Sequence, residues 1–424
     1  MSVNKLAIAA GVVTAAIFGA IAYKDTLTAN YAGTERLDGH TVIITGANSG
    51  IGKATTLELA KRGAKIFMAC RDLESCELAR QEIVHASANE RVYCRECNLA
   101  SLKSINLFAQ KIKKEEHAVH ILINNAGVMG IPEHTKTKEG LELHFGINYF
   151  GHFVLTNLLL DKLKATGPAR VITVSCPQHL KGTINFEDLN GEDKYDPDVA
   201  YSQSKLACVL FNRELAKKLK DYCVTVNVAD PGYTYTEITR HKTYRTNHLL
   251  NHFAHPAMLI LFRTPVQGAQ TILHCALHPE LRRTTGKYFD NCVQIEPAAE
   301  GIDDEVGAQL WDLSEKLMEP IIPVKKKRLL HGKKLTKQAK PEKTEETEIP
   351  EETEKPEKGG KAEKADKGDK PEKPEKPGKG DKPEKPEKPG KGEKPEKPEK
   401  PGKGAKPDKA EKAGKNGKQE KPEK

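Results

Sequence analysis

The stretch TVIITGANSGIG, residues 41–52, organises the rest of the chain. Its apolar and β-branched residues 42–45 predict a short strand, and Gly46, Gly50 and Gly52 then lead into a helix-favouring run that starts at Lys53. A strand, a tight turn and a helix start leave free backbone N–H groups pointing at one spot, where the positive end of the helix dipole also acts. An anionic pyrophosphate is the natural occupant, and the alternative on these residues alone is a glycine-rich turn without a ligand.

The glycine spacing departs from G-x-G-x-x-G and matches T-G-x-x-x-G-x-G. Three further motifs follow along the chain: NNAG at residues 124–127, YSQSK at 201–205 and PG at 231–232. With these four ordered motifs the chain resembles the short-chain dehydrogenase/reductase family over roughly residues 37–317. Stretches such as ACRD, NNAGVM and YSQSKLA are similar to the retinol dehydrogenase branch of that family.

Strand and helix patterns alternate from residue 37 to about residue 317, which predicts an α/β fold with a mostly parallel sheet. Seven strands are expected at residues 41–45, 65–69, 91–95, 121–124, 170–174, 224–228 and 286–289. Together with helices on both faces they would form one doubly wound Rossmann domain over residues 37–320. The ligand crevice should lie at the carboxyl ends of the strands, where all four motifs fall.

The charge is unevenly distributed along the chain. Residues 325–424 hold 33 Lys and Arg against 23 Asp and Glu, whereas the other 324 residues hold 35 against 36. The nearly neutral globular part argues against a nucleic-acid-binding surface there.

The last hundred residues have a repetitive composition. The block DKPEKPEKPGKG at residues 369–380 recurs at 381–392 and, with Glu393 in place of Asp, at 393–404. No aromatic residue follows Trp311, and apolar residues nearly vanish. Such a segment cannot bury enough surface to offset its chain entropy, so we expect residues 325–424 to form a disordered tail whose partners stay unknown.

An 18-residue apolar run at residues 6–23, between Lys5 and Lys24, is just long enough to span a bilayer core. AIA at residues 20–22 also fits a signal-peptidase site, so a cleaved signal peptide is the alternative. Nine cysteines without a framework spacing, and the lack of any Asn-x-Ser/Thr site, favour a reducing or non-secretory compartment. We therefore expect a transmembrane anchor over residues 1–24, in a mitochondrial or endoplasmic reticulum membrane.

Cys94 and Cys97 form a C-x-x-C pair, expected at or beyond the end of a strand. No second Cys or His pair lies at zinc spacing, so the sequence predicts no metal site.

Tyr201 and Lys205 are four residues apart in a stretch, 200–219, that predicts a helix, so both side chains project from one face. An adjacent ammonium favours a phenolate, so we expect Lys205 to lower the pKa of Tyr201 toward the range that a general acid/base needs. A surface pair on an amphipathic helix is the alternative. By resemblance, Tyr201 gives or takes the alcohol proton, and Lys205 also holds the nicotinamide ribose.

By the same resemblance Asn148, in GINYFGHF, anchors a proton-relay water, and its alternative role is to cap or kink a helix. The resemblance also implies a set of residues that bind the cofactor: Gly46, Asn48, Ser49, Gly50, Ile51, Gly52, Arg71, Asn98, Leu99, Asn125, Ala126, Gly127, Tyr201, Lys205, Pro231, Gly232, Thr234 and Thr236.

Cofactor choice depends on the end of the second predicted strand, Cys70-Arg71-Asp72. An acidic residue in the leading place would bind the ribose 2′-hydroxyl of NAD(H), whereas an arginine accepts the 2′-phosphate of NADP(H). Because Arg71 leads, the sequence favours NADP(H), and NAD(H) stays open. The segment 233–264 interrupts the alternation and by resemblance covers the substrate, with a surface excursion or a second membrane contact through residues 256–262 as alternatives.

Three positions depart from the family pattern. Cys176 occupies the place of the catalytic serine, with Ser175 one residue earlier and expected to face the other way. Asn98 stands where an aspartate is usual, and Asp230 replaces the usual residue before Pro231. Cys176 is the most serious change, because a thiol is a weaker hydrogen-bond donor than a hydroxyl.

Two functions are compatible with these features. The first is an NADP(H)-dependent, membrane-anchored oxidoreductase for a hydrophobic alcohol/aldehyde pair such as retinol and retinal, a substrate class that the resemblance implies. The second is a weakly active or inactive cofactor-binding member that acts as a scaffold or sensor through its tail. The oligomeric state is not determined by the sequence, with a homodimer among the alternatives.

Overall fold

The computed structural model describes residue 14 and residues 18–247, 257–258 and 261–319. The predicted tail at residues 325–424 lies outside these residues, as do most of the apolar run 6–23 and positions 256, 259 and 260 of the stretch 256–262. Within the described residues, no helix combines the length and the apolar character that a membrane span requires.

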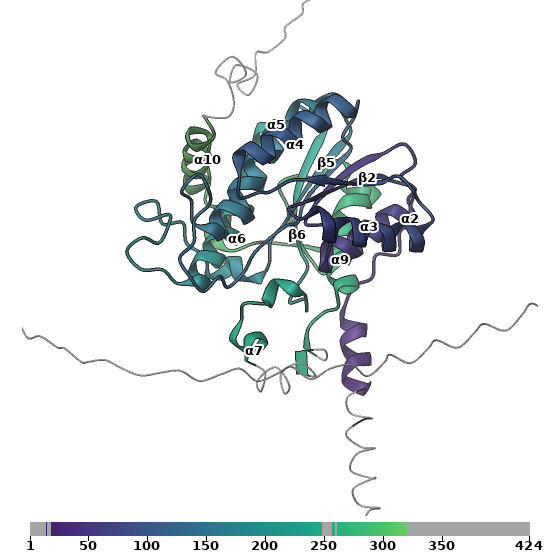
Figure 1. Cartoon of the computed structure of the whole chain (residues 1–424), viewed down its shortest axis with the longest axis horizontal. Helices are drawn as coiled ribbons and strands as arrows, with labels where there is room; N and C mark the ends of the chain where they lie inside the picture. The colour runs from purple at the N-terminus through teal and green to yellow at the C-terminus, as the bar shows by residue number, and fades with distance from the viewer. Residues whose placement is uncertain (1–13, 15–17, 248–256, 259–260, 320–424) are drawn as a thin grey trace, which may run out of the picture. The chain divides into compact units, whose positions relative to one another are not determined.

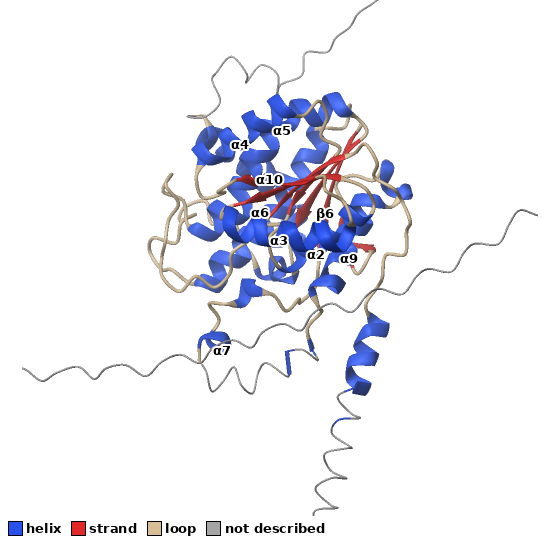
Figure 2. Cartoon of the chain, turned by 45° about the vertical axis from the view of Figure 1, so that its right-hand side comes forward, coloured by secondary structure: helices blue, strands red, loops and turns tan. Residues whose placement is uncertain are grey.

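One eight-stranded sheet forms the centre of the domain, in the order β3-β2-β1-β4-β5-β6-β7-β8. Figure 2 shows its strands, in red, among the surrounding helices. The first seven strands pair in parallel, and β8 runs antiparallel to β7. The doubly wound α/β class is thereby confirmed. The strands are β1 (Thr41–Thr45), β2 (Lys65–Cys70), β3 (Val92–Glu96), β4 (Ile121–Asn124), β5 (Ala169–Val174), β6 (Val224–Asp230), β7 (Tyr288–Asp290) and β8 (Val293–Ile295).

The prediction of seven strands is wrong by one, because β8 was missed. Its three residues are all exposed, and a run of three is too short for its alternation of apolar and polar residues to stand out in the sequence. The turn before it consists of Asn291 and Cys292, with φ of 49° and 63°. Two positive φ values in a two-residue turn are typical of a β-hairpin, but the usual glycine signal is absent here.

Two helical layers cover the sheet, because successive strand residues point to opposite faces. In β1, Ile43 joins one buried cluster, whereas Val42 and Ile44 join the other. The first cluster is completed by α4 (Leu102–Glu115), α5 (Gly151–Thr166), α6 (Pro197–Lys218) and α10 (Asp304–Met318), and the second by α2 (Gly50–Lys61), α3 (Leu73–Ser87) and α9 (Pro265–Leu277) (Figure 1).

Side-chain caps define where several of these helices begin. Asp72 accepts hydrogen bonds from two backbone N–H groups of the first turn of α3, and Asp196 does the same for α6. Thr264 and Gln267 form a capping box at the start of α9. These caps place the starts of α3 and α6 beside the carboxyl ends of the strands that precede them.

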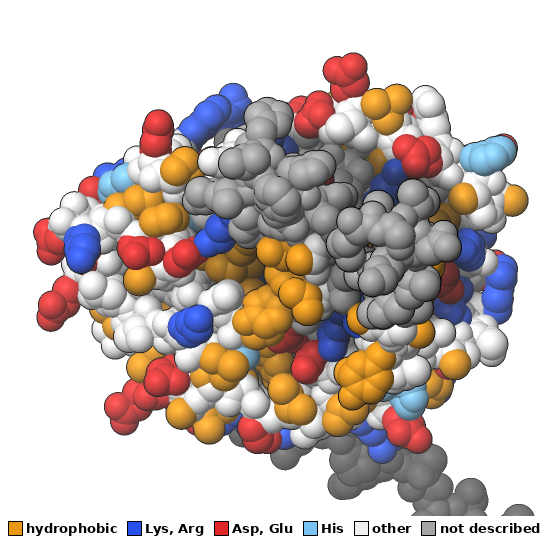
Figure 3. Space-filling model, turned by 90° about the horizontal axis from the view of Figure 1, so that it is seen from below, with side chains coloured by type: hydrophobic (Ala, Val, Ile, Leu, Met, Phe, Trp, Pro, Cys, Tyr) orange, Lys and Arg blue, Asp and Glu red, His pale blue; other side chains and the backbone are white. Residues whose placement is uncertain are grey.

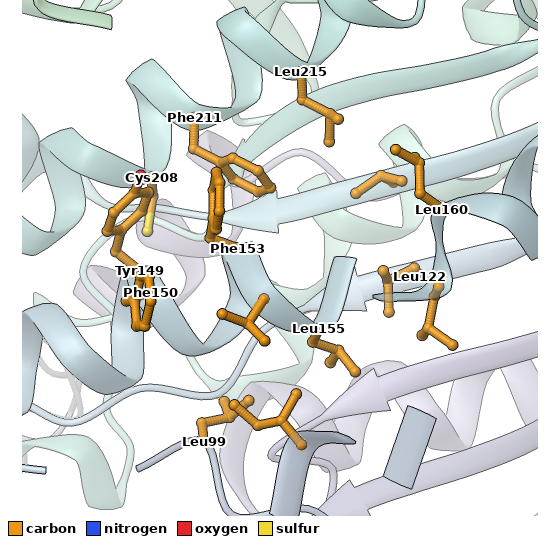
Figure 4. Close-up of a cluster of buried hydrophobic side chains, with 14 of the residues drawn as sticks. Leu99, Leu122, Tyr149, Phe150, Phe153, Leu155, Leu160, Cys208, Phe211 and Leu215 are labelled. Carbon is orange, nitrogen blue, oxygen red and sulfur yellow. The ribbon is translucent and has the colours of Figure 1, made fainter. Parts of the chain in front are cut away.

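Aromatic packing fixes α6 on the sheet. The ring of Phe153 on α5 lies 4.9 Å from that of Trp311 on α10, edge to face, and the ring of Phe211 on α6 stacks 6.0 Å from Trp311. Figure 4 shows Phe153 and Phe211 together among buried leucines such as Leu155 and Leu215. Because α6 carries Tyr201 and Lys205, this core holds the predicted catalytic helix in place.

A disulfide joins Cys76 of α3 to Cys94 of β3, with Cα atoms 6.1 Å apart. The predicted C-x-x-C pair therefore does not act as one unit, because Cys94 lies within β3 and Cys97 is a free, buried thiol one residue beyond it. The sequence did not reveal the pairing, since Cys76 and Cys94 are 18 residues apart and meet only when α3 packs on the sheet.

Candidate active site

The cavity of the domain opens where the strand order reverses, between β1 and β4. Its volume is about 710 Å³. Every residue predicted to bind the cofactor lines it, together with Cys176. Four separate motifs and the turn with Cys176 therefore meet at one cavity. Asn148 is not among the described residues that line it.

The turn after β1 fits a phosphate-bearing ligand. Gly46 has a φ of +64°, and a Cβ there would lie 2.9 Å from the Cα of Ala126. A Cβ on Gly52 would collide with the Gly46 carbonyl and come within 2.6 Å of Asn125 Nδ2. Ser49 precedes α2 without a side-chain cap, so the first N–H groups of this helix stay available to an anion.

The ends of β1 and β4 are tied together by Thr45. Its hydroxyl accepts hydrogen bonds from the backbone N–H groups of Asn125 and Ala126, each at 2.9 Å. The Asn125 side chain donates in return to the Thr45 carbonyl at 2.8 Å. These bonds hold the NNAG motif against the glycine turn and explain why both line the same cavity.

The far end of the cavity is bordered by Arg71, Asp72 and Asn98. The Asp72 carboxylate is occupied as the cap of α3, accepting from the N–H groups of Glu74 and Ser75 at 3.2 Å each. Arg71 is exposed, and within the described chain its guanidinium has no hydrogen-bond or salt-bridge partner. Asn98 Oδ1 accepts a hydrogen bond from the backbone N–H of Ala100 at 3.0 Å, which fixes the Asn98 side chain in the cavity wall.

The two residues predicted to form the catalytic pair both lie on α6. Tyr201 and Lys205 are both buried, with 4% and 3% of their surface exposed. Lys205 Nζ donates to the Val174 carbonyl at 3.1 Å and lies 5.7 Å from the centre of the Tyr201 ring. The alternative of a surface Tyr–Lys pair is therefore wrong.

Cys176 takes the position expected of the serine. Its Sγ lies 3.4 Å from the Tyr201 hydroxyl, whereas the Ser175 hydroxyl, although Ser175 also lines the cavity, donates to the Lys205 carbonyl at 3.0 Å. The predicted strand register is thus correct at these two residues. Burial raises the pKa of the Cys176 thiol and the Lys205 ammonium opposes this shift, so the group stays a thiol and can donate a hydrogen bond.

The Tyr201 phenol is held in its protonated form. Burial raises its pKa well above the ordinary value, and the neighbouring Cys176 raises it further. The expected lowering by Lys205 is wrong here, because enclosure of the phenol in a low-dielectric wall outweighs the ammonium, which is directed at a carbonyl. A phenol that keeps its proton is suited to donate it to a substrate oxygen.

Asn148 lies behind this pair. Its side chain accepts from the Val128 N–H at 2.8 Å and donates to the Val128 carbonyl at 3.0 Å and to Ser204 at 2.9 Å. The backbone carbonyl of Asn148 accepts from His152 Nδ1 at 2.8 Å and from Cys208 Sγ at 3.2 Å. Asn148 also sits in a π-helical turn, η1 (Phe145–Phe150), so the alternative of a helix distortion is realised, and the water-binding role stays a prediction.

The loop after β6 closes the other side of the cavity. Thr234 donates to the Pro231 carbonyl at 3.1 Å, and Thr236 caps a short 3-10 turn, η3 (Glu237–Thr239). A Cβ on Gly50 would lie 3.1 Å from the Thr236 methyl group, so this loop lies directly over the glycine turn.

Sequence reasoning missed part of the wall. These residues come from the turn after β5, the first turn of α6 and the segment after Pro231-Gly232, and include Gln178, Lys181, Asp198, Val199, Ile238, Lys242 and Phe262. Asp198 could have been found from its place three residues before Tyr201, because this spacing puts both on one face of the helix. Several described residues of segment 233–264 line the cavity, and the role of this segment in covering the substrate stays a prediction.

Charge and apolar surface are mixed on the side of the molecule where α7 (Thr243–Thr246) lies. Figure 3 views this side and shows apolar side chains gathered near its middle among acidic and basic ones. Lys242 and Asp198, both of which line the cavity, form a salt bridge that links the segment after η3 to the start of α6.

Comparison with known proteins agrees with this geometry. Residues 40–247 match the family described as short chain dehydrogenase. Retinol dehydrogenase 13 of Mus musculus is 46% identical over 309 residues, which is 72% of this chain and 92% of that protein. Its Homo sapiens counterpart is 47% identical over 301 residues, with coverage of 70% and 91%. Retinol dehydrogenase 11 of Homo sapiens is 43% identical over 286 residues, with coverage of 67% and 87%.

Solved structures share the fold. An uncharacterised protein from Mycobacterium paratuberculosis aligns with a TM-score of 0.56 at 34% identity, covering 69% of this chain and 97% of that one. Levodione reductase aligns with a TM-score of 0.51 at 17% identity, which shows the fold alone. With the four motifs, the Tyr201–Lys205 pair in a buried cavity and these relatives, the chain belongs to the short-chain dehydrogenase/reductase family, in its retinol dehydrogenase branch, and is an oxidoreductase.

Proposed function

We propose that this protein is an NADP(H)-dependent reductase of hydrophobic aldehydes, with retinal-like compounds as the substrate class. The observation that carries the proposal is the pair of donors formed by the Tyr201 hydroxyl and the Cys176 thiol, 3.4 Å apart in the same cavity as the glycine turn. Two donors aimed at one point can bind a carbonyl oxygen and stabilise the charge that develops on it.

Each residue of this group has a defined task. Tyr201 gives its proton to the substrate oxygen, and Cys176 donates a hydrogen bond to the same oxygen. Lys205, anchored on the Val174 carbonyl, is placed to hold a ribose hydroxyl and to favour the phenolate that remains after the proton has left. The nicotinamide nucleotide supplies the hydride when it is bound. A protonated phenol can give its proton to the oxygen of a carbonyl substrate as the hydride arrives.

The preference for NADP(H) rests on Arg71. Its side chain is exposed at the cavity wall, whereas the neighbouring Asp72 carboxylate is occupied by the two backbone N–H groups that it caps in α3. A 2′-phosphate would meet a cation rather than a carboxylate at this point. Arg71→Ala should weaken NADPH binding by about 1.5–3 kcal/mol and NADH binding much less. Equal losses in a fluorescence titration with both cofactors would remove Arg71 from the phosphate site.

The hydrophobic substrate class rests on the rest of the wall. Met129, Val199, Tyr233 and Phe262 line the cavity and are not assigned to the cofactor. The retinol dehydrogenases 13 of Mus musculus and Homo sapiens are 46% and 47% identical to this chain, which supports the same substrate class here.

The test is NADPH-dependent turnover by the purified full chain, with all-trans-retinal and a short water-soluble aldehyde as substrates. We expect reduction of retinal with the lower KM, a preference for NADPH over NADH, and no turnover in Tyr201→Phe. If the chain binds NADPH but reduces neither aldehyde, the enzyme proposal fails in favour of a cofactor-binding scaffold.

We also propose that residues 6–23 anchor the protein in a membrane, on the strength of their length and apolar composition. Deletion of residues 1–24 should release the protein from carbonate-washed membranes and leave cofactor binding intact, because β1 starts only at Thr41. Retention of the shortened chain on the membranes would contradict this assignment.

A further inference from the structure

A helical segment at residues 18–27 precedes the sheet and ends beside the cavity wall. Lys24 Nζ donates to the backbone carbonyl of Phe262 at 3.1 Å, and Phe262 lines the cavity. Gln267 Nε2, in the first turn of α9, donates to Asp25 Oδ1 at 2.6 Å. These partners are 238 and 242 residues apart in the sequence, so tertiary contacts hold the end of this helix at the cavity wall.

The chain that follows this helix is tied to the turn between β7 and β8. Asn291 Nδ2 donates to the Leu27 carbonyl at 3.0 Å, and Asn291 Oδ1 accepts from the N–H of Ala29 at 2.8 Å. The same Oδ1 accepts from the Arg263 guanidinium at 3.3 Å, and Arg263 also donates to the Pro231 carbonyl at 3.0 Å. The place where the N-terminal helix meets the domain is therefore defined by contacts that reach the Pro231-Gly232 motif.

The cavity wall at this place carries exposed apolar side chains. The ring of Tyr233 stacks 6.1 Å from that of Phe262, and both residues line the cavity. Tyr233 is 54% exposed, while Leu261 and Val266, which directly precede Phe262 and Gln267, are 71% and 63% exposed. Leu261 and Val266 are not among the described residues that line the cavity, so their surface is open to a partner outside it. We call Tyr233, Leu261, Phe262 and Val266 the apolar rim.

The apolar run at residues 6–23 meets the domain at this rim. Its last residue, Tyr23, is followed by Lys24, and tyrosine and lysine at the end of an apolar segment prefer the interface between lipid and water. Phe18 and Tyr23 are exposed, so the described end of the run presents apolar surface. Because Lys24 is bonded to the Phe262 carbonyl, insertion of the run into a bilayer would bring the apolar rim to that interface.

We propose that the apolar rim lies on a lipid bilayer and that the hydrophobic aldehyde enters the cavity directly from the lipid. The inference rests on the proposed anchor and the proposed substrate class. A retinal-like aldehyde dissolves in lipid, because transfer of its apolar surface into water is unfavourable, and entry at the rim spares it this transfer. A bilayer, rather than a second copy of the chain, is the occupant because a run long enough to span it ends at these same contacts.

The position of the rim is tested by tryptophan fluorescence in the full chain. Its one tryptophan, Trp311, is buried, so Leu261→Trp adds an emitter at the rim. The protein is bound to phosphatidylcholine vesicles that carry bromine on the acyl chains, which quench a tryptophan in contact with lipid. We expect strong quenching in Leu261→Trp and in Val266→Trp, which is the second site if the first variant does not fold.

Leu107→Trp is the matched control and should not be quenched. Leu107 is 56% exposed on α4, which lies on the other side of the domain from α7, the helix of segment 233–264 (Figure 1). Circular dichroism checks that each variant folds.

The possible outcomes separate the two proposals. A chain that does not bind the vesicles refutes the anchor and the inference together. If the chain binds while both rim variants emit as Leu107→Trp does, the anchor stands and the inference is overturned. A Leu261→Trp emission that moves to shorter wavelength with rising protein concentration, without vesicles, would assign the rim to a second copy of the chain and would also overturn it.

The route of the substrate is tested by kinetics. Leu261→Glu and Val266→Glu place a charge on the rim, which lipid rejects, and neither position is among the described residues of the cavity wall. We expect kcat/KM for all-trans-retinal carried in vesicles to fall severalfold, while the rate with a short water-soluble aldehyde stays at the wild-type value. Leu107→Glu should match the wild type with both substrates.

Two kinetic results would overturn the entry route. A fall of equal size for both substrates would show a disturbed site, and an unchanged rate with vesicle-borne retinal would show entry from water. If the wild type reduces no aldehyde, the reductase proposal and the entry of an aldehyde both fail, whereas the fluorescence result still decides whether the rim lies on lipid.

Discussion

Cys176→Ser should increase the reductase turnover of this protein. The exchange replaces a thiol, 3.4 Å from the Tyr201 hydroxyl, with a shorter and stronger hydrogen-bond donor. The neighbouring Ser175 cannot take over this role, since its hydroxyl is committed to the Lys205 carbonyl at 3.0 Å. The site therefore depends on residue 176 for its second donor.

The size of the gain follows from what one such donor contributes. Complete loss of a preorganised donor to a developing oxyanion costs about 100- to 1000-fold in turnover, and a thiol keeps part of this effect. We expect about a tenfold gain in Cys176→Ser, equivalent to about 1.4 kcal/mol of transition-state stabilisation. The gain should fall on kcat rather than KM, because the charge on the oxygen develops only in the transition state.

The assay is steady-state reduction of all-trans-retinal with saturating NADPH, in the full chain. Cys223→Ser, at an exposed thiol, controls for the removal of a cysteine, and Tyr201→Phe should abolish turnover in both backgrounds. Equal kcat for Cys176→Ser and the wild type, at a measurable rate, would show that the second donor comes from elsewhere and would refute the role given to residue 176.

Two further predictions concern the glycine turn after β1 and the buried carboxylate of Asp230. Gly52→Ala should weaken the binding of NADPH and NADH alike, because the new methyl group would collide with the Gly46 carbonyl and crowd Asn125; undiminished binding would show that the helix start does not hold the pyrophosphate. Asp230 has a pKa that folding raises from 3.8 to about 6, so its protonated form stabilises the fold below pH 4, and this contribution is lost as the pH rises through 6. The free energy of unfolding of the wild type should therefore fall by about 3 kcal/mol relative to Asp230→Asn between pH 4 and pH 7, as measured by urea denaturation. A constant difference between the two proteins over this range would refute the pKa assigned to Asp230.

Much of the fold was predictable because its signals are local. The apolar run before Gly46 predicted β1, and both ends of this strand were correct. The helix-favouring run after Gly52 predicted α2 and, with the glycines, the turn between the two elements. The spacing of Tyr201 and Lys205 placed both on one face of α6, where they are buried together. These features depend on residues a few positions apart, so the order of the residues is sufficient to indicate them.

The sequence by itself also determined the motif residues that line the cavity, since the carboxyl ends of parallel strands meet at one edge of a sheet. Only the tertiary structure decided how those residues are charged and held. The high pKa of Tyr201 arises from enclosure by several elements, and Asp230 meets Tyr288 across 58 residues of sequence. The Cys76–Cys94 disulfide and the exposed strand β8 likewise depend on packing between segments. Burial and long-range hydrogen bonds belong to the assembled layers of the domain, because no stretch of the chain encloses its own side chains.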